Sequence, residues 1–196
     1  MESAFMVPKG HLSEEDRFFL LKLARESIEN YINDKPLPKF DKKNLSKVLQ
    51  EDGASFVTLT YKGYLRGCVG TLEPYQSFVE DVQEHAVAAA FQDYRFPPVR
   101  ADEMDDIQIE ISYLTRPEIL KYTNPDDLLK LLRPNIDGVV IRDGMRRATF
   151  LPQVWEKIPY PEEFLEQLCI KMGTAPDLWK RKKLEILVYQ VEEFHE

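Results

Sequence analysis

The residues best suited to chemistry lie together in the segment LRGCVG, residues 65–70. Cys68 is one of only two cysteines in the chain, and Arg66 lies two positions before it. A nearby cation favours the thiolate, which would make Cys68 a nucleophile or a redox centre. A free cysteine is, however, among the most buried residue types and commonly behaves as a small hydrophobe. Both interpretations of Cys68 stay open.

The two glycines of this segment predict a close approach to the backbone. Gly67 and Gly70 interrupt a pattern otherwise typical of a β-strand, and a glycine inside a strand marks a bulge or a point where another group comes near. Strand alternation places Arg66, Cys68 and Gly70 on one face unless a bulge changes the register. Gly70 would then leave open volume beside the thiol. We therefore expect a small-ligand pocket formed by Arg66, Gly67, Gly70 and Thr71 around Cys68.

His85 is the histidine nearest to Cys68 in the sequence. It is therefore the candidate base for a cysteine nucleophile and a candidate wall of the pocket. It also shares a helical face with Val82, Ala86 and Ala89, which is typical of a buried, hydrogen-bonded histidine. The sequence supports either role.

Arg95 belongs to a second unusual segment, AAAFQDYRFPPV, residues 88–99. Guanidinium groups suit carboxylates and phosphates, so Arg95 and Arg100 could complete a site for a small anion with Arg66. The alternative is an ordinary surface ion pair between Arg95 and Asp93. The sequence does not separate these two interpretations.

The elements that must position these residues follow no regular strand–helix alternation. Periodicity and caps predict helices from Ser13 to just before Pro36 and over residues 77–92, 125–132 and 161–172, the last with Cys169 in its apolar face. Strands are expected at 54–61, 64–70, 107–113, 139–142, 146–151 and 185–191. This pattern predicts an α+β fold with a largely antiparallel sheet of about six strands and four to five helices.

Composition excludes several classes of protein. Lys and Arg total 26 against 34 Asp and Glu, a net charge of −8, which makes nucleic-acid binding through bulk charge a poor fit. Residues 1–98 have a net charge of −3 and residues 99–196 a net charge of −5, so the two halves of the sequence are similar in charge. Three scattered histidines and two distant cysteines offer no metal-ligand spacing, and no apolar run suits a membrane span. We expect no metal, no cofactor and a cytoplasmic location.

Five ordered segments resemble the AMMECR domain family. LRGCVG is similar to its hallmark LRGC(I/V)G hexapeptide, and similarity extends to residues 88–99, 109–114, 150–154 and 163–173. The resemblance implies an intracellular α+β protein with an antiparallel sheet and no established activity. It also implies one AMMECR-type domain over residues 1–196, with its core at about 10–194, as one unit or two fused subdomains. In microbes, the implied partners are a Memo-like protein and a radical S-adenosylmethionine protein.

Three functional hypotheses follow. The leading one is a protein that binds a small ligand, such as an anion, or a partner through a pocket at residues 66–71, with Arg95 and His85 in its wall. The second is an enzyme that uses Cys68 as nucleophile or redox centre. The third, a regulatory protein that binds nucleic acid, is disfavoured by the acidic composition.

Overall fold

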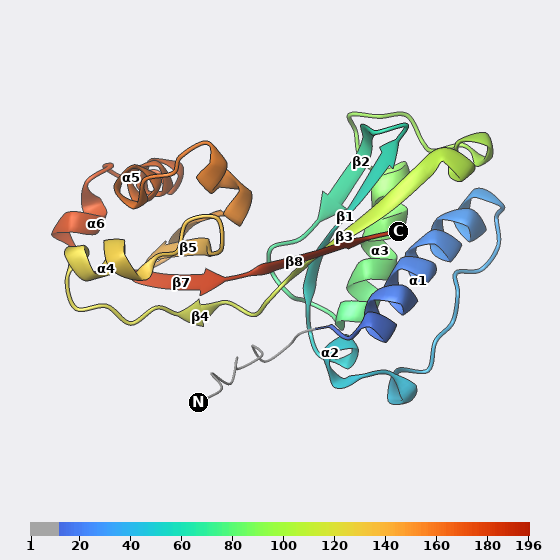
Figure 1. Cartoon of the computed structure of the whole chain (residues 1–196), viewed down its shortest axis with the longest axis horizontal. Helices are drawn as coiled ribbons and strands as arrows, with labels where there is room; N and C mark the ends of the chain where they lie inside the picture. The colour runs from blue at the N-terminus through green and yellow to red at the C-terminus, as the bar shows by residue number, and fades with distance from the viewer. Residues whose placement is uncertain (1–11) are drawn as a thin grey trace, which may run out of the picture. The chain divides into compact units, whose positions relative to one another are not determined.

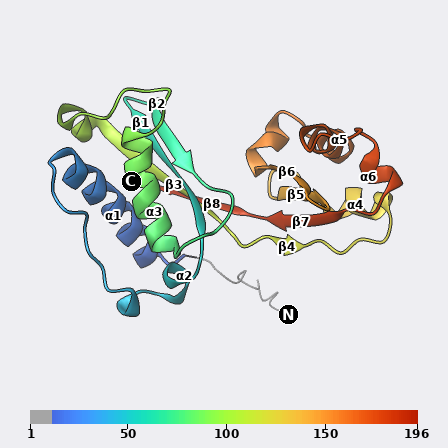
Figure 2. The same cartoon turned by 180° about the vertical axis from the view of Figure 1, so that it is seen from behind.

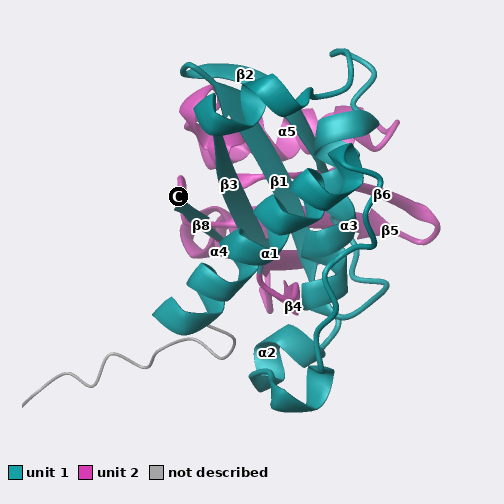
Figure 3. Cartoon of the chain, turned by 90° about the vertical axis from the view of Figure 1, so that its right-hand side faces the viewer, with its two compact units in different colours: residues 1–114, 192–196 teal, residues 115–191 magenta. Residues whose placement is uncertain are grey.

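The computed structural model describes residues 12–196 (Figure 1). The chain forms two compact units (Figure 3). Unit 1 contains the residues up to 114 together with residues 192–196, and unit 2 contains residues 115–191. Unit 1 is therefore discontinuous in sequence, because the end of the chain returns to it.

Unit 1 is one sheet with helices on one face. The strand order is β2-β1-β3-β8, with β1 at Ala54–Tyr61, β2 at Tyr64–Gly70, β3 at Ile107–Leu114 and β8 at Val191–His195. Helices α1 (Glu14–Ile32) and α3 (Phe78–Phe91) lie side by side against the sheet in both views, and α2 is short (Lys47–Gln50) (Figures 1 and 2). A single apolar core joins these helices to the sheet.

The register of the strands decides which side chains reach this core. Val57 and Leu59 of β1 are fully buried beside Ile109 and Ile111 of β3. The alternating positions of β1 point to the other face of the sheet. The pairing of β1 with β2 contains a β-bulge. Leu59 lies opposite Gly67 and Thr60 lies opposite Leu65, so Arg66 is the additional residue of β2.

Serine residues stand at the N-caps of both α1 and α3, but only the serine of α1 caps its helix with a side-chain hydrogen bond. Ser13 forms the predicted cap of α1: its Oγ accepts a hydrogen bond from the backbone N of Asp16, and the Asp16 carboxylate accepts one from the backbone N of Ser13. Ser77 stands at the start of the helix predicted over residues 77–92, but its side chain forms no capping hydrogen bond to the backbone of α3. Instead the Ser77 hydroxyl donates to Glu80, whose carboxylate also pairs with Lys42.

Unit 2 is a second sheet with its own core. Its order is β4-β7-β5-β6, with β4 at Glu118–Ile119, β5 at Gly138–Asp143, β6 at Arg146–Phe150 and β7 at Glu185–Tyr189. Its helices are α4 (Pro125–Leu131), α5 (Pro161–Lys171) and α6 (Leu178–Arg181). Trp155 stacks on Phe164 with 3.6 Å between ring centroids, and Cys169 is fully buried in the same core, as expected.

The α+β class with antiparallel pairing is confirmed, with differences in detail. The described residues form eight strands in two four-stranded sheets, whereas the sequence indicated one sheet of about six. The strand predicted at 185–191 is interrupted at Gln190, so its end becomes the start of β8 in the sheet of unit 1. Among the residues described, no helix is long and apolar enough to cross a membrane.

Candidate functional site

Cys68 lies at the centre of β2, on the face of the sheet turned away from α3. Its direct neighbour on β1 is Thr58, whose hydroxyl donates a hydrogen bond of 3.3 Å to the sulfur. The next residue across, on β3, is Glu110. All three side chains are half-buried. They form one row across three strands, here called the Cys68 row (Cys68, Thr58 and Glu110).

Both glycines of the hexapeptide allow a close approach of the backbone, as the sequence predicted. A Cβ atom at Gly67 would lie 2.1 Å from the carbonyl oxygen of Ala89 on α3. A Cβ atom at Gly70 would lie 2.2 Å from the carbonyl oxygen of Ser55 and 2.6 Å from Cα of Phe56. The expectation of open volume at Gly70 is therefore wrong, because strand β1 fills that space.

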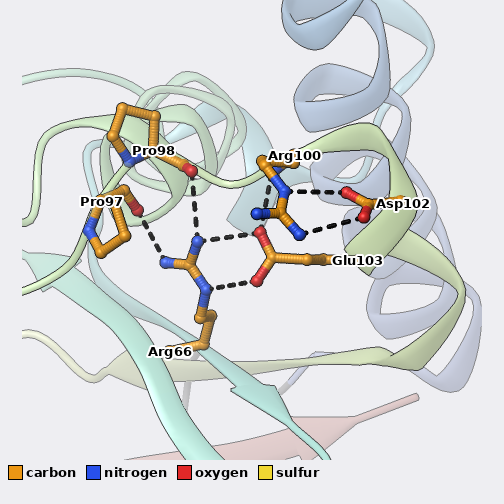
Figure 4. A network of polar contacts seen from close by, with 6 residues as sticks. All are labelled: Arg66, Pro97, Pro98, Arg100, Asp102 and Glu103. Atoms are coloured by element: carbon orange, nitrogen blue, oxygen red, sulfur yellow. Dashed lines mark hydrogen bonds and ion pairs between the residues drawn. The ribbon is translucent and has the colours of Figure 1, made fainter.

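Arg66 is fully engaged by neighbouring groups (Figure 4). Its Nε and Nη2 donate to the Glu103 carboxylate at 2.9 and 3.0 Å. Its Nη1 and Nη2 donate to the carbonyl oxygens of Pro97 and Pro98 at 2.8 and 3.2 Å. The side chain is only 11% exposed, and its proximity holds the pKa of Glu103 below the usual range. Arg66 thus ties β2 to residues 97–103.

A second ion pair holds the outer edge of β2. One oxygen of Asp93 accepts a hydrogen bond of 2.9 Å from the backbone N of Cys68. Arg95 donates to both oxygens of Asp93 and, at 3.4 Å, to the carbonyl oxygen of Cys68. The Arg95 guanidinium is the main reason that the pKa of Asp93 lies far below its ordinary value. The two side chains occupy the backbone groups that an edge strand would otherwise leave free.

The arginines of the expected anion site are therefore each paired with a carboxylate. Arg95 pairs with Asp93, as one interpretation of the sequence had it, and Arg100 pairs with Asp102 at 3.0 Å (Figure 4). The charges of Arg66, Arg95 and Arg100 are balanced by carboxylates of unit 1.

His85 is a buried, hydrogen-bonded histidine and is not the base for Cys68. Its Nδ1 lies 3.1 Å from an Asp81 oxygen that also accepts a 2.6 Å hydrogen bond from the Ser55 hydroxyl. His85 is 6% exposed and belongs to α3, which packs on the face of β2 that carries Gly67. Since neighbouring strand residues point to opposite faces, the Cys68 thiol lies on the other side.

Thr71 follows the end of β2 and has local partners. Its backbone N donates to the Ser55 carbonyl at 3.0 Å, and its hydroxyl exchanges hydrogen bonds with the backbone of Glu73. The structure therefore places the predicted residues around one strand, with Arg66 and Arg95 at its edge and His85 beneath it. Thr58, Glu110 and Glu103 were missed by the sequence analysis, because only the strand pairing and the path of residues 97–103 bring them to β2.

Within residues 12–196, no three His, Cys, Asp or Glu side chains are arranged to hold a metal ion. The polar groups around Cys68 are instead a hydroxyl, a carboxylate and two ion pairs. Such groups can orient a ligand, but they supply no metal centre.

Comparisons with known proteins agree with the resemblance seen in the sequence. The family model AMMECR1 matches residues 21–194. A protein of Methanothermobacter thermautotrophicus is 38% identical, with 94% of this chain and 96% of that protein covered. Protein MJ0810 of Methanocaldococcus jannaschii is also 38% identical, over 94% of this chain and 92% of its own length.

A solved structure is similar as well. The crystal structure of the uncharacterised protein PH0010 from Pyrococcus horikoshii has a TM-score of 0.73 and 32% identity, and covers 94% of this chain and 93% of its own. Sequence and fold thus agree over nearly the whole chain. The chain belongs to the AMMECR1 family.

Proposed function

We propose that this protein is a binding protein that contacts its ligand or partner through the Cys68 row. One observation carries the proposal: a half-buried thiol, hydrogen-bonded to Thr58, lies on a strand that two ion-paired networks hold in place. A surface held rigid before binding loses less entropy when the complex forms. The Arg66 network reaches no residue of the row, and the Asp93–Arg95 pair reaches only the backbone of Cys68, so the side chains of the row are left for contacts with another molecule.

The charged side chains in and around the Cys68 row indicate what kind of ligand group it can bind. Glu110 forms no ion pair within the described part of the chain, and it supplies the carboxyl group of the row. A small anion, as expected from Arg66 and Arg95, would have to compete with Glu103 and Asp93 for those guanidiniums. We therefore expect the row to bind a neutral or cationic group that donates hydrogen bonds to Glu110.

The partners belong to the proposal too. The family resemblance suggests a Memo-like protein and a radical S-adenosylmethionine protein, acting with this chain in the cytoplasm. We expect the Memo-like protein to cover the Cys68 row. The row would then serve as the contact at which the two proteins share a ligand.

Alkylation of Cys68 provides the test. Cys169 is fully buried, so iodoacetamide labelling of the folded protein reports Cys68. The Memo-like protein from the same organism should slow this labelling at least fivefold when it is present at a saturating concentration. An unchanged labelling rate in a demonstrated complex would contradict the use of the row.

Two threonine variants give a matched comparison. Thr58→Val removes the hydroxyl that contacts the thiol, whereas Thr60→Val makes the same change two positions along β1, opposite Leu65 and Gln108. We expect Thr58→Val and Glu110→Gln to weaken the complex about tenfold, with little effect of Thr60→Val. Equal effects of both threonine variants would count against the proposal.

The second candidate is an enzyme that uses Cys68. The Thr58 hydroxyl donates toward the sulfur, which stabilises negative charge there. His85 is on the opposite side of the sheet, so Glu110 is the remaining titratable member of the row. Mass spectrometry of the peptide that contains Cys68, after incubation with both proposed partners, tests this candidate. An increase in mass from a covalent adduct on Cys68 would support it. An unmodified Cys68 would contradict it.

A further inference from the structure

Unit 2 contains a surface pocket far from the Cys68 row in sequence. The pocket has a volume of about 230 Å³ and is lined by the segment after β4 and by helix α4. Its lining residues all belong to unit 2: Lys121, Tyr122, Thr123, Asp127, Lys130 and Leu131. This volume is smaller than that of most drug-sized pockets and suits a small polar group.

Two lysines of the lining are exposed and have no carboxylate partner in the described residues. These are Lys121, before α4, and Lys130, in its last turn. Two other lysines of unit 2 are neutralised by carboxylates: Lys180 pairs with Glu162, and Lys182 pairs with Asp143 at 2.7 Å. The two pocket ammonium groups are therefore available for an anion from solution.

The floor of the pocket is rigid. The Tyr122 hydroxyl donates to the carbonyl oxygen of Leu184 at 2.9 Å and accepts from its backbone N at 2.8 Å. Burial raises the pKa of Tyr122, so the hydroxyl keeps the proton that this pair of hydrogen bonds needs. The Lys183 ammonium lies 5.7 Å from the centroid of the same ring and adds a third positive charge near the pocket.

One carboxylate must be counted against these cations. Asp127 lines the pocket, and its carboxylate accepts a hydrogen bond of 3.0 Å from the Asn124 side chain. Three lysines around Tyr122 still outnumber it. Unit 2 as a whole has 13 Lys and Arg against 11 Asp and Glu, whereas unit 1 has 13 against 23. An anion is therefore attracted to unit 2 although the whole chain is acidic.

We propose that this pocket binds a small phosphate-bearing ligand, with Lys121 and Lys130 as the groups that contact the phosphate. A phosphomonoester carries nearly two negative charges at neutral pH and accepts several hydrogen bonds, which two ammonium groups can supply. Thr123 also belongs to the lining, and its hydroxyl would be an additional donor. This site is independent of the function proposed for the Cys68 row.

Titration of the full-length protein with inorganic phosphate, glycerol phosphate and malonate, followed by NMR, tests this site. We expect saturable shifts of the amides of Thr123 and Lys130 with the two phosphates and none with malonate. Saturation by malonate alone would assign the pocket to carboxylates and overturn the proposal. An absence of saturable shifts with any of the three would overturn it as well.

Charge-matched variants separate a specific site from general attraction. Lys121→Gln and Lys130→Gln should each weaken phosphate binding about tenfold, because each removes one charged contact. Lys157→Gln removes the same charge from an exposed position of unit 2 outside the pocket and should leave affinity unchanged. A similar loss in all three variants would show unspecific attraction and contradict the proposal. The fluorescence of Trp155 and Trp179, both in the core of unit 2, checks that each variant is folded.

Discussion

Among the single residues of the hexapeptide LRGCVG, the two glycines are required for packing, whereas the cysteine is available for binding. Gly67 and Gly70 are needed because the backbone of a neighbouring element occupies the space of a side chain. Cys68, between them, points to the face opposite that of Gly67, where Thr58 contacts its sulfur. A ligand-binding role for the segment and a packing role therefore belong to different residues of the same strand.

Gly67→Ala should destabilise unit 1 strongly. The added methyl carbon would lie 2.1 Å from the carbonyl oxygen of Ala89, which belongs to the backbone of the packed helix α3, so α3 must move away from β2. We expect a loss of about 2 to 3 kcal/mol in the free energy of unfolding, measured by urea denaturation and circular dichroism. Leu65→Ala on the same strand is the control, because that side chain is 45% exposed and should cost less than about 1 kcal/mol.

Asp93 should make the stability of unit 1 depend on pH in acid. Its pKa is lowered in the folded protein, chiefly by Arg95, so its stabilisation is complete above the unfolded value of about 3.9 and is lost as the pH falls below it. Asp93→Asn should lower the free energy of unfolding by about 2 kcal/mol at pH 7 and flatten its decline in acid. Urea denaturation between pH 7 and pH 2.5 measures both effects, and an equally steep acid decline in the variant would contradict this assignment.

At the scale of elements, β2 is an edge strand whose outer side is occupied by a loop. Residues 93–98 follow α3 and supply Asp93, Arg95 and two proline carbonyls to β2. Two segments that the sequence analysis singled out separately are thus parts of one assembly. Because β2 carries Cys68, this assembly also positions the Cys68 row.

Arg66→Lys should loosen this assembly without unfolding it. A lysine has one ammonium group and cannot reproduce the fork that binds Glu103 and both proline carbonyls (Figure 4). Amide hydrogen exchange in residues 66–70 and 97–103 should become at least fivefold faster, with α1 unchanged. Arg100→Lys is the matched control, since the Arg100 side chain is 72% exposed and pairs with an equally exposed Asp102. Equal acceleration by both variants would contradict the special role of Arg66.

At the scale of the whole molecule, the last residues of the chain complete the sheet of unit 1. Phe194 is buried in the core of unit 1, and Glu192 and Glu196 pair with Arg17 and Arg25 of α1. Unit 2 is thus inserted between two parts of unit 1 in the sequence. Truncation at the C-terminus should therefore damage the unit built mostly from the N-terminal half.

Deletion of residues 192–196 tests this arrangement. Both tryptophans of the chain lie in unit 2, so their fluorescence reports that unit, while the circular dichroism signal of the long helices α1 and α3 reports unit 1. The deletion should lower the helical melting temperature by at least 10 °C and leave the fluorescence transition within a few degrees. Truncation after Phe194, which keeps most of β8, is the control. Equal shifts of both signals would contradict the assignment of these residues to unit 1.

The local elements of this protein can be predicted from short stretches of its amino-acid sequence. Helix α1 begins at the cap formed by Ser13 and Asp16, and the strands β1 and β2 follow from their residue pattern, because these signals depend on neighbours a few residues away. The glycines of LRGCVG likewise predicted a close approach to the backbone, and the resemblance of five segments identified the family.

The contacts between these elements depend, in contrast, on the tertiary fold. The neighbours of Cys68 come from β1 and β3, the partner of Arg66 is 37 residues away, and His85 was assigned to the opposite face by the packing of α3. The similar charges of the two sequence halves also hide the contrast between the acidic unit 1 and the weakly basic unit 2. Strand register, helix packing and the return of β8 join residues distant in sequence, and local residue preferences carry no information about such contacts.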